Sequence, residues 1–293
     1  TPDGAGNVNP ASGTYDENEQ ITINVVASPD YVFSGWSGDW SGSNTPLTLV
    51  MDSDKTLTAN FEIADSDGDG VNDEVDQDNN TRSGVPVDSN GVMINPIYLD
   101  DNGVTIKAYD WSIVGDVGTV NGKEYTVVSE SQLRDMFENE RDLTAVCTSK
   151  VTNMRRLFSY QMLNDETRTD LDYLISFNQD ISAWDTSSVT DMSQMFHYAV
   201  SFNQDIGNWS TSNVKRMANM FRDASVFQQN ISKWNSGSVT SFTNMFKWAT
   251  TFQAKWECGI NGPPSSCTTL RSDWIAPPTP RLPPPSPQSS DRN

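Results

Sequence analysis

A 25-residue unit repeats along the second half of the chain, and it restricts the possible folds more than any other feature. Counted from one tryptophan to the next, the units begin at Trp184, Trp209 and Trp234 and run without a gap. Six aligned columns keep their size and polarity: Val189, Val214 and Val239; Met192, Met217 and Phe242; Met195, Met220 and Met245; Phe196, Phe221 and Phe246; Ala199, Ala224 and Ala249; Phe202, Phe227 and Phe252. A period of this length predicts a solenoid, in which each unit buries its apolar face against its neighbours.

The repeat also extends backwards, into a unit that carries an insertion. This earlier unit matches the Val, Met, Met and Phe columns with Val151, Met154, Leu157 and Phe158. Thirteen extra residues then precede Phe177, and we expect them to form a loop on one face. The repeat block therefore holds about four units over residues 143–257.

Within each unit, two short motifs predict different local structure. The spacing of V-x-x-M-x-x-M-F suits a short helical turn, whereas FNQDI suits a brief strand that stacks into a narrow parallel sheet. The ladder of Gln179, Gln204 and Gln229 would then either hydrogen-bond between units or face a ligand. The tryptophan column is expected to pack in the core. His197, the only histidine, aligns with Arg222 and Lys247 and is expected on the surface.

The motif FNQDIS-x-WDTSSVTDMSQMF resembles the BspA-like leucine-rich-repeat surface proteins of bacteria. The resemblance covers residues 143–256. It implies a secreted or surface-anchored protein that acts in adhesion and in contact with a host or neighbour. The family has no catalytic residues to transfer to this chain.

Residues 1–63 alternate apolar and polar side chains in several short runs, which predicts strands with one buried face. The runs contain Ile21, Ile23 and Val25; Val32 beside Tyr31 and Phe33; Leu47 and Leu49; Leu57, Ala59 and Phe61. Between them, SGWSGDWSG predicts a Gly-rich turn. This pattern resembles the divergent InlB B-repeat modules of bacterial surface proteins. Trp36 and Trp40 are expected to pack in the core, the alternative being an aromatic platform for a sugar ring.

Residues 65–78, DSDGDGVNDEVDQD, carry the most specific chemistry in the chain. Five carboxylates and one backbone carbonyl fall at the spacing of a loop that wraps a hard divalent cation. The predicted ligands are the side chains of Asp65, Asp67, Asp69, Asp73 and Asp76 and the carbonyl of Val71, with Gly70 at the sharp turn. Such close carboxylates repel one another without a cation. We therefore expect a Ca²⁺ site here, the alternative being an acidic linker.

Two features separate this loop from an EF-hand: its last ligand is Asp76 in place of Glu, and no amphipathic helices flank it. The pattern instead resembles a thrombospondin type 3 calcium repeat. That resemblance implies a calcium-binding linker over residues 64–91 that is floppy without the ion and stiff with it. Asp78 is a candidate for the start of a second, partial site, which the sequence leaves open.

Residues 92–142 are expected to form a cap over the first repeat unit. DDNG after Leu99 and the pair Asn121-Gly122 predict hairpins, and Ser129 resembles the N-cap of a helix over residues 130–139. Residues 258–293 form a Pro-rich tail. Cys258 and Cys267 could be bridged or free, while Cys147 is expected to be a buried, unreactive residue.

Composition excludes several classes of protein. The formal net charge is -20, from 39 acidic and 19 basic residues, and it disfavours nucleic acid and anionic bilayers as partners. The sequence contains no apolar run long enough to span a membrane. It starts at Thr1 without Met, which we interpret as a mature segment. It lacks a Ser-His-Asp set, a Cys-His pair and a phosphate loop, so we expect no enzyme.

The sequence as a whole predicts a mainly β protein with short helical turns: a small β module, a calcium-binding linker, a hairpin-helix cap and a short leucine-rich-repeat-like solenoid. The expected function is adhesion or display outside the cell or on its surface, by binding surface proteins or glycans through the solenoid. The alternative is a structural subunit of an extracellular filament or surface layer, which binds copies of itself.

Overall fold

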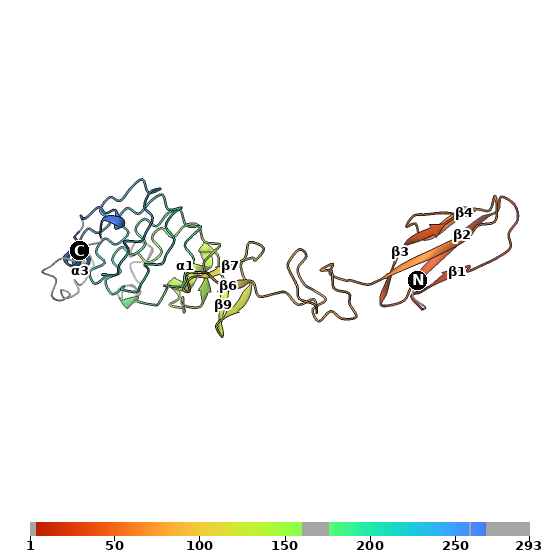
Figure 1. Cartoon of the computed structure of the whole chain (residues 1–293), viewed down its shortest axis with the longest axis horizontal. Helices are drawn as coiled ribbons and strands as arrows, with labels where there is room; N and C mark the ends of the chain where they lie inside the picture. Colours follow the sequence, from red (N-terminus) through yellow and green to blue (C-terminus); the bar gives the residue numbers. More distant parts are fainter. Residues whose placement is uncertain (1–3, 160–175, 258, 268–293) are drawn as a thin grey trace, which may run out of the picture. The chain divides into compact units, whose positions relative to one another are not determined.

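The computed structural model describes residues 4–159, 176–257 and 259–267. The protein is mainly β with few short helices, and it divides into two compact units, residues 1–94 and 95–293 (Figure 1). Each unit has an apolar core of its own.

The first unit contains two small antiparallel sheets. The predicted strands are confirmed, and their alternating side chains place Ile23, Leu47 and Leu49 in a shared core. The sequence missed the first strand, which pairs with the second. The sheets have the orders β1-β2-β4 and β3-β5, with β1 Gly6–Asn9, β2 Gln20–Ala27, β3 Tyr31–Gly38, β4 Leu47–Val50 and β5 Leu57–Ile63.

The Gly-rich stretch around Trp36 is strand up to Gly38 and then turns back, so that Trp36 forms an antiparallel bridge with Gly42 and the predicted turn is confirmed. β3 continues to Gly38, with a bulge between Phe33 and Gly35, because Gly35 adopts a φ of 141° that other residues rarely reach. Trp36 is buried, and its indole N–H donates a hydrogen bond of 3.0 Å to the Asn44 carbonyl. Trp40 is half-buried against the same core. The expectation that the two indoles pack in the core is confirmed.

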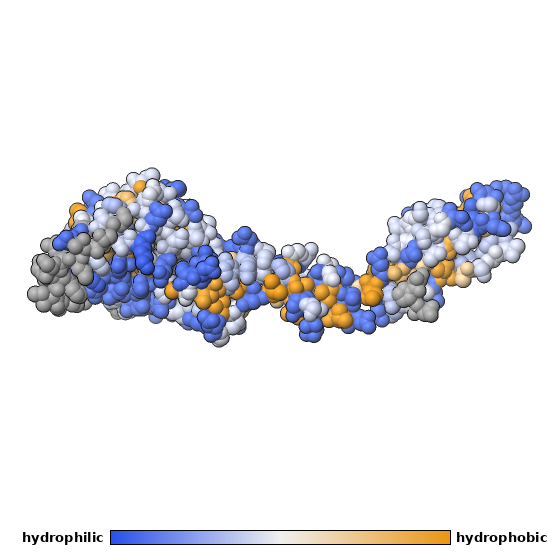
Figure 2. Space-filling model, in the orientation of Figure 1, coloured by the Kyte–Doolittle hydropathy of each residue, from blue (hydrophilic) through white to orange (hydrophobic). Residues whose placement is uncertain are grey.

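Residues 64–94 have almost no apolar core. The structure describes all of them, and they form turns with one isolated bridge, between Val87 and Met93. The apolar side chains of Val75, Val92 and Ile94 are exposed, by 52%, 37% and 39%, and Figure 2 shows apolar surface over this segment. Hydrogen bonds of polar groups must therefore determine the shape of this segment.

At the start of the second unit, the predicted hairpins and helix are confirmed. Asn121 and Gly122 form a two-residue turn with φ of 51° and 78°, and Ser129 and Gln132 form the capping box of the helix. The elements are β6 Ile97–Leu99 paired with β7 Ile106–Ala108, β8 Val117–Val120 paired with β9 Lys123–Val127, β10 Val146–Cys147 parallel to β9, and α1 Glu130–Glu138.

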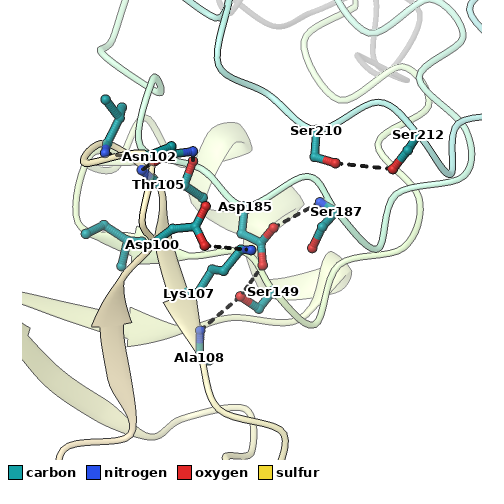
Figure 3. A network of polar contacts seen from close by, with 12 residues as sticks. Asp100, Asn102, Thr105, Lys107, Ala108, Ser149, Asp185, Ser187, Ser210 and Ser212 are labelled. Atoms are coloured by element: carbon teal, nitrogen blue, oxygen red, sulfur yellow. Dashed lines mark hydrogen bonds and ion pairs between the residues drawn. The ribbon is translucent and has the colours of Figure 1, made fainter. Parts of the chain in front are cut away.

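A polar network attaches the β6–β7 hairpin to the first repeat units (Figure 3). The buried Asp185 carboxylate accepts a 2.6 Å hydrogen bond from the Ser149 hydroxyl, whose oxygen accepts one from the Ala108 N–H. Lys107 pairs with Asp100 at 3.0 Å, and this hydrogen bond raises the pKa of Lys107. The hairpin is thus joined to the repeats by directed bonds.

The repeat units stack so that each apolar column becomes a row of touching side chains. The indole of Trp209 lies 6.2 Å from that of Trp184 and 6.3 Å from that of Trp234, and the rings are nearly parallel. Phe221 stacks in the same way between Phe196 and Phe246. These rows form one continuous core, and the expectation that the tryptophans are core residues is confirmed.

The backbone links between units lie where a helical turn was predicted. Isolated parallel bridges join Asn153 to Asp191, Asp191 to Arg216 and Arg216 to Ser241. The helical turn does not form because alternate residues of the segment, Met192, Gln194 and Phe196, donate their N–H groups to the next unit, and Gln194 has a φ of 60°. The prediction of a helical turn in this motif is therefore wrong.

The FNQDI segments are not strands where the structure describes them, so the prediction of a parallel sheet there is also wrong. Their glutamines link the units instead. Gln204 donates to the Asn178 carbonyl at 2.9 Å, and Gln229 donates to the Asn203 carbonyl at 2.6 Å. The interpretation of this ladder as hydrogen bonds between units is confirmed.

The last unit ends in a helix that the sequence did not reveal, and a second unpredicted element follows it. The helix α3, Thr250–Lys255, ends the repeats, and a short 3-10 helix, Pro264–Ser266, follows it. The Phe246 N–H donates to the Ile260 carbonyl, and Cys267 is buried in the repeat core. Cys258, the insertion after Ser159 and most of the Pro-rich tail lie outside the described residues.

Candidate metal centre and binding surface

Three of the predicted metal ligands converge at the start of the acidic segment. One carboxylate oxygen from each of Asp65, Asp67 and Asp69 lies within 4.8 Å of the other two. Calcium binds oxygens at about 2.3–2.6 Å, so two ligands of one ion lie at most about 5 Å apart. The spacing of the three carboxylates therefore fits a calcium ion.

Backbone hydrogen bonds hold these carboxylates in place. Asp65 accepts from the N–H groups of Gly68 and Gly70, at 2.8 and 3.0 Å, and Asp69 accepts from Val71 at 2.8 Å. Gly68 and Gly70 have φ of 74° and 98°, a conformation that glycine adopts without strain. The local sequence thus folds into a turn that directs side-chain oxygens inward.

Three buried oxygens in this loop lack a donor among the described residues. They are Oδ2 of Asp69, Oδ1 of Asn72 and Oδ2 of Asp76. A buried acceptor without a hydrogen-bond partner costs about 1–3 kcal/mol. A cation would satisfy such acceptors, so the residues present fit a calcium ion. Asn72 was not among the predicted ligands, although an amide oxygen directly after Val71 is a suitable calcium ligand.

Asp73 differs from the other predicted ligands because both of its oxygens are engaged elsewhere. They accept hydrogen bonds from the N–H and the hydroxyl of Ser66, at 2.7 and 2.6 Å. These bonds tie the start of the loop to its middle. Metal ligation by Asp73 and by the Val71 carbonyl stays a prediction.

The electrostatics of the loop also reflect crowded negative charge. The hydrogen bond from Val71 lowers the pKa of Asp69, but burial and the charges of Asp67, Asp76 and Asp65 outweigh it, and the pKa is raised overall. A bound cation would reverse this effect. Among the described residues, one group of three acidic side chains is close enough to hold a metal ion, and Asp78 is not in it.

On the repeat block, the expectation that His197 is exposed is wrong. Its side chain is 7% exposed, its ring lies 4.5 Å from that of Tyr198, and Nε2 lies 3.8 Å from Asp223. Burial lowers the pKa of His197 to about 4, and the charges of Arg222 and Arg156 add to this effect.

The alignment of His197 with Arg222 and Lys247 suggested an exposed position, but these two side chains are longer than the imidazole and extend further toward solvent. The guanidinium carbon of Arg222 lies 4.7 Å from the centre of the Trp248 ring, and Nζ of Lys247 lies 4.3 Å from it. The Trp248 ring is 39% exposed. Long cationic side chains can cover an aromatic ring and still reach solvent, whereas the short imidazole cannot.

A groove crosses the first three units beside the backbone bridges. It has a volume of about 350 Å³ and is lined by Arg155, Asp191, Ser193, Gln194, Arg216, Ala218 and Asn219. The Nε–H of Arg216 donates to Asp191 at 2.9 Å, while the Arg216 side chain stays 64% exposed. The lining residues occupy columns in which the units differ from one another; Arg155 and Arg216 are exposed, whereas Asp191 and Ser193 are buried.

Two segments of the chain match known families. Residues 1–65 match the divergent InlB B-repeat domain, which confirms that resemblance. Residues 130–258 match DUF285, a family described as a Mycoplasma protein of unknown function. No curated protein and no solved structure matches the chain. The two family matches support a surface-associated repeat protein.

One further finding concerns membranes. In the described part of the chain, every helix is too short or too polar to cross a bilayer.

Proposed function

We propose that this chain is a non-catalytic adhesion or display protein, located outside the cell or on its surface. Its repeat block is a short leucine-rich-repeat-like solenoid that binds other proteins or glycans. Its acidic segment is a thrombospondin type 3-like loop that binds Ca²⁺ and becomes stiff. The family matches support the location, and the geometry of the repeats supports the binding role.

The binding role is supported by a difference between two kinds of position in each repeat, the buried apolar columns and the exposed positions between them. The aligned apolar columns are buried almost completely, so they explain only the stacking of the units. Exposed positions between them differ from unit to unit, as Thr190, Lys215 and Thr240 do in one column and Arg155 and Thr243 do in another. A constant scaffold with a variable outer face is the arrangement that repeat proteins use for recognition.

The calcium role rests on the three orphaned oxygens and the three converging carboxylates. A segment with little apolar burial becomes ordered when the ion binds, because the free energy of ion binding then stabilises the folded form of the segment. Calcium would link Asp65, Asp67 and Asp69 to Asn72 and Asp76. The result would be a rigid spacer in place of a flexible acidic chain.

Protein and glycan arrays probed with the labelled full chain test the binding role. We expect saturable signals on a defined subset of spots. A variant with two substitutions on the outer face of the repeats, Lys215→Ser and Thr243→Lys, keeps the core columns intact. If the outer face binds the ligands, this variant should bind a different subset of spots. Signals equal to those of an acidic non-repeat protein on every spot would contradict the proposal.

Calorimetric titration with CaCl₂ tests the metal role. We expect one site that Asp69→Asn weakens at least tenfold. Asp52→Asn is the matched control, because Asp52 is an exposed aspartate paired with Lys55 at 2.6 Å outside the loop. Light scattering in the same buffers addresses the filament alternative: growth in size with concentration would favour a structural subunit, and a constant monomer would exclude it.

A further inference from the structure

Basic side chains gather in one part of each repeat, although the chain as a whole is acidic. The V-x-x-M-x-x-M-F segments and the two residues after them carry six basic residues and two acidic ones. The basic residues are Arg155, Arg156, Lys215, Arg216, Arg222 and Lys247, and the acidic ones are Asp191 and Asp223. A cationic region on a protein of net charge -20 is a local feature that bulk composition does not explain.

The groove beside the backbone bridges lies within this basic region. Arg155 comes from the first unit and Arg216 from the third, and between them the groove is lined by the small residues Ser193 and Ala218. Both arginine side chains reach solvent. Asp191 engages only the Nε–H of Arg216, so the rest of this guanidinium group can still bind an anion in a bidentate manner.

The stacking of the units sets the distance between the two arginines. Neighbouring backbones in a parallel ladder lie about 4.8 Å apart, and the bridges from Asn153 to Asp191 and from Asp191 to Arg216 make two such steps. Arg155 lies two residues beyond Asn153, at most about 7 Å further along its unit, so the Cα atoms of Arg155 and Arg216 lie roughly 10 to 12 Å apart. Long, flexible side chains at this separation can reach acidic groups on every second unit of a linear polymer.

We propose that this groove binds an acidic polysaccharide, with Arg155 and Arg216 contacting its carboxylate or sulfate groups. The proposal rests on the proposed function of the repeats as a binding surface and specifies the class of ligand. The small side chains of Ser193 and Ala218 leave room for the sugar rings between the two arginines.

The lining of the groove disfavours other polyanions. Protein interfaces depend on aromatic and large apolar side chains at their centre, and the groove has none among its lining residues. Single-stranded nucleic acid requires aromatic rings on which bases stack, and these are absent from the lining as well. A hydrated polymer of hydroxyl and acid groups remains the best match.

The test is a titration of the full chain with three polymers of matched length: polygalacturonate, which is carboxylated, heparin, which is sulfated, and dextran, which is neutral. Polyglutamate serves as an acidic peptide. We expect saturable binding to at least one acidic polysaccharide, none to dextran, and a decrease of about tenfold between 50 and 300 mM NaCl.

The variant Arg155→Gln with Arg216→Gln should lose about tenfold or more in affinity. Its matched control, Arg141→Gln with Lys233→Gln, removes the same charge from exposed positions outside the groove and should bind normally. Arg155→Glu alone tests the site without disturbing Asp191, in case the double variant unfolds.

Equal binding by the groove variants and the control would overturn the proposal, as would tight binding of dextran or of polyglutamate, or no binding of either acidic polysaccharide. These outcomes are separate from the array experiment. Failure here with a reproducible array pattern leaves the repeats as a binding surface for another ligand, whereas a blank array contradicts the binding function itself.

Discussion

The repeat block and the acidic segment of residues 64–94 are stabilised by opposite means. In the repeats, apolar columns such as that of Phe196, Phe221 and Phe246 are fully buried, and each unit contacts the next through rings and backbone bonds. In the acidic segment, carboxylates accept hydrogen bonds from backbone N–H groups, while the side chains of Val75 and Ile94 remain exposed. Both segments are irregular in secondary structure, so irregularity by itself does not indicate flexibility.

The difference identifies which region depends on its surroundings. A stacked apolar core gains free energy from burial whatever the ionic conditions. A loop of converging carboxylates is destabilised by its own charge until a cation binds. We therefore expect calcium, pH and core mutations to affect the stability of the two regions differently.

Phe221→Ala should destabilise the repeat block by about 4 kcal/mol, because a large ring is removed from between two neighbouring units. Urea denaturation followed by tryptophan fluorescence measures this effect. Lys215→Ala, at an exposed side chain of the same unit, is the control and should cost less than about 1 kcal/mol. A loss below 1 kcal/mol for Phe221→Ala would show that the units do not share one core.

Acidification should destabilise the repeat block through His197. Its pKa is lowered to about 4 in the folded protein, against 6.5 as the ordinary value, so the unfolded chain binds the proton first. Stability is therefore lost as the pH falls from about 6.5 to about 4, by about 3 kcal/mol in all. His197→Gln should remove this dependence above pH 5, and an unchanged slope would show that the imidazole is solvated.

Asp76→Asn and Asp73→Asn test whether both residues bind calcium, as their spacing in the sequence predicts. Asp76 has a buried oxygen without a donor, whereas both oxygens of Asp73 bind Ser66. We expect Asp76→Asn to weaken calcium binding by about 30-fold, or about 2 kcal/mol. Asp73→Asn should weaken it by less than about fivefold. The reverse order in a calorimetric titration would place Asp73 on the metal.

Gly91→Ala and Gly68→Ala provide a finer test of the same loop. Both glycines have a φ of 74°, so both substitutions carry a similar backbone strain, of about 1 kcal/mol. An added Cβ at Gly91 would collide with the Asp76 carboxylate, whereas at Gly68 it meets open space. Gly91→Ala should therefore lower calcium affinity by several-fold more, and equal affinities would place Asp76 away from the metal.

Much of the fold could be predicted because side-chain periodicity reports burial directly. The alternation around Ile23 and the capping box at Ser129 each gave the correct element, and the repeat columns gave the correct core. The backbone of the repeats could not be predicted in this way. Apolar spacing of three residues is common to a helical turn and to stacked β-turns, and a residue such as Gln194 with positive φ decides between them.

The candidate sites show the same limit. The spacing of Asp65, Asp67 and Asp69 predicted their convergence, because the three carboxylates lie in one short loop. The engagement of Asp73 by Ser66, the orphaned oxygen of Asn72 and the burial of His197 depend on side-chain directions, which spacing does not encode. The groove between Arg155 and Arg216 joins residues of different units and becomes visible only when the units are stacked.

Amide hydrogen exchange of the full chain with and without calcium tests the contrast between the two regions most directly. Calcium should slow exchange in residues 64–94 by about tenfold or more and leave the repeat units 176–257 unchanged. Asp69→Asn should abolish the slowing. Exchange in residues 64–94 that is equally slow in EDTA, or an equal response of the repeats to calcium, would contradict the account.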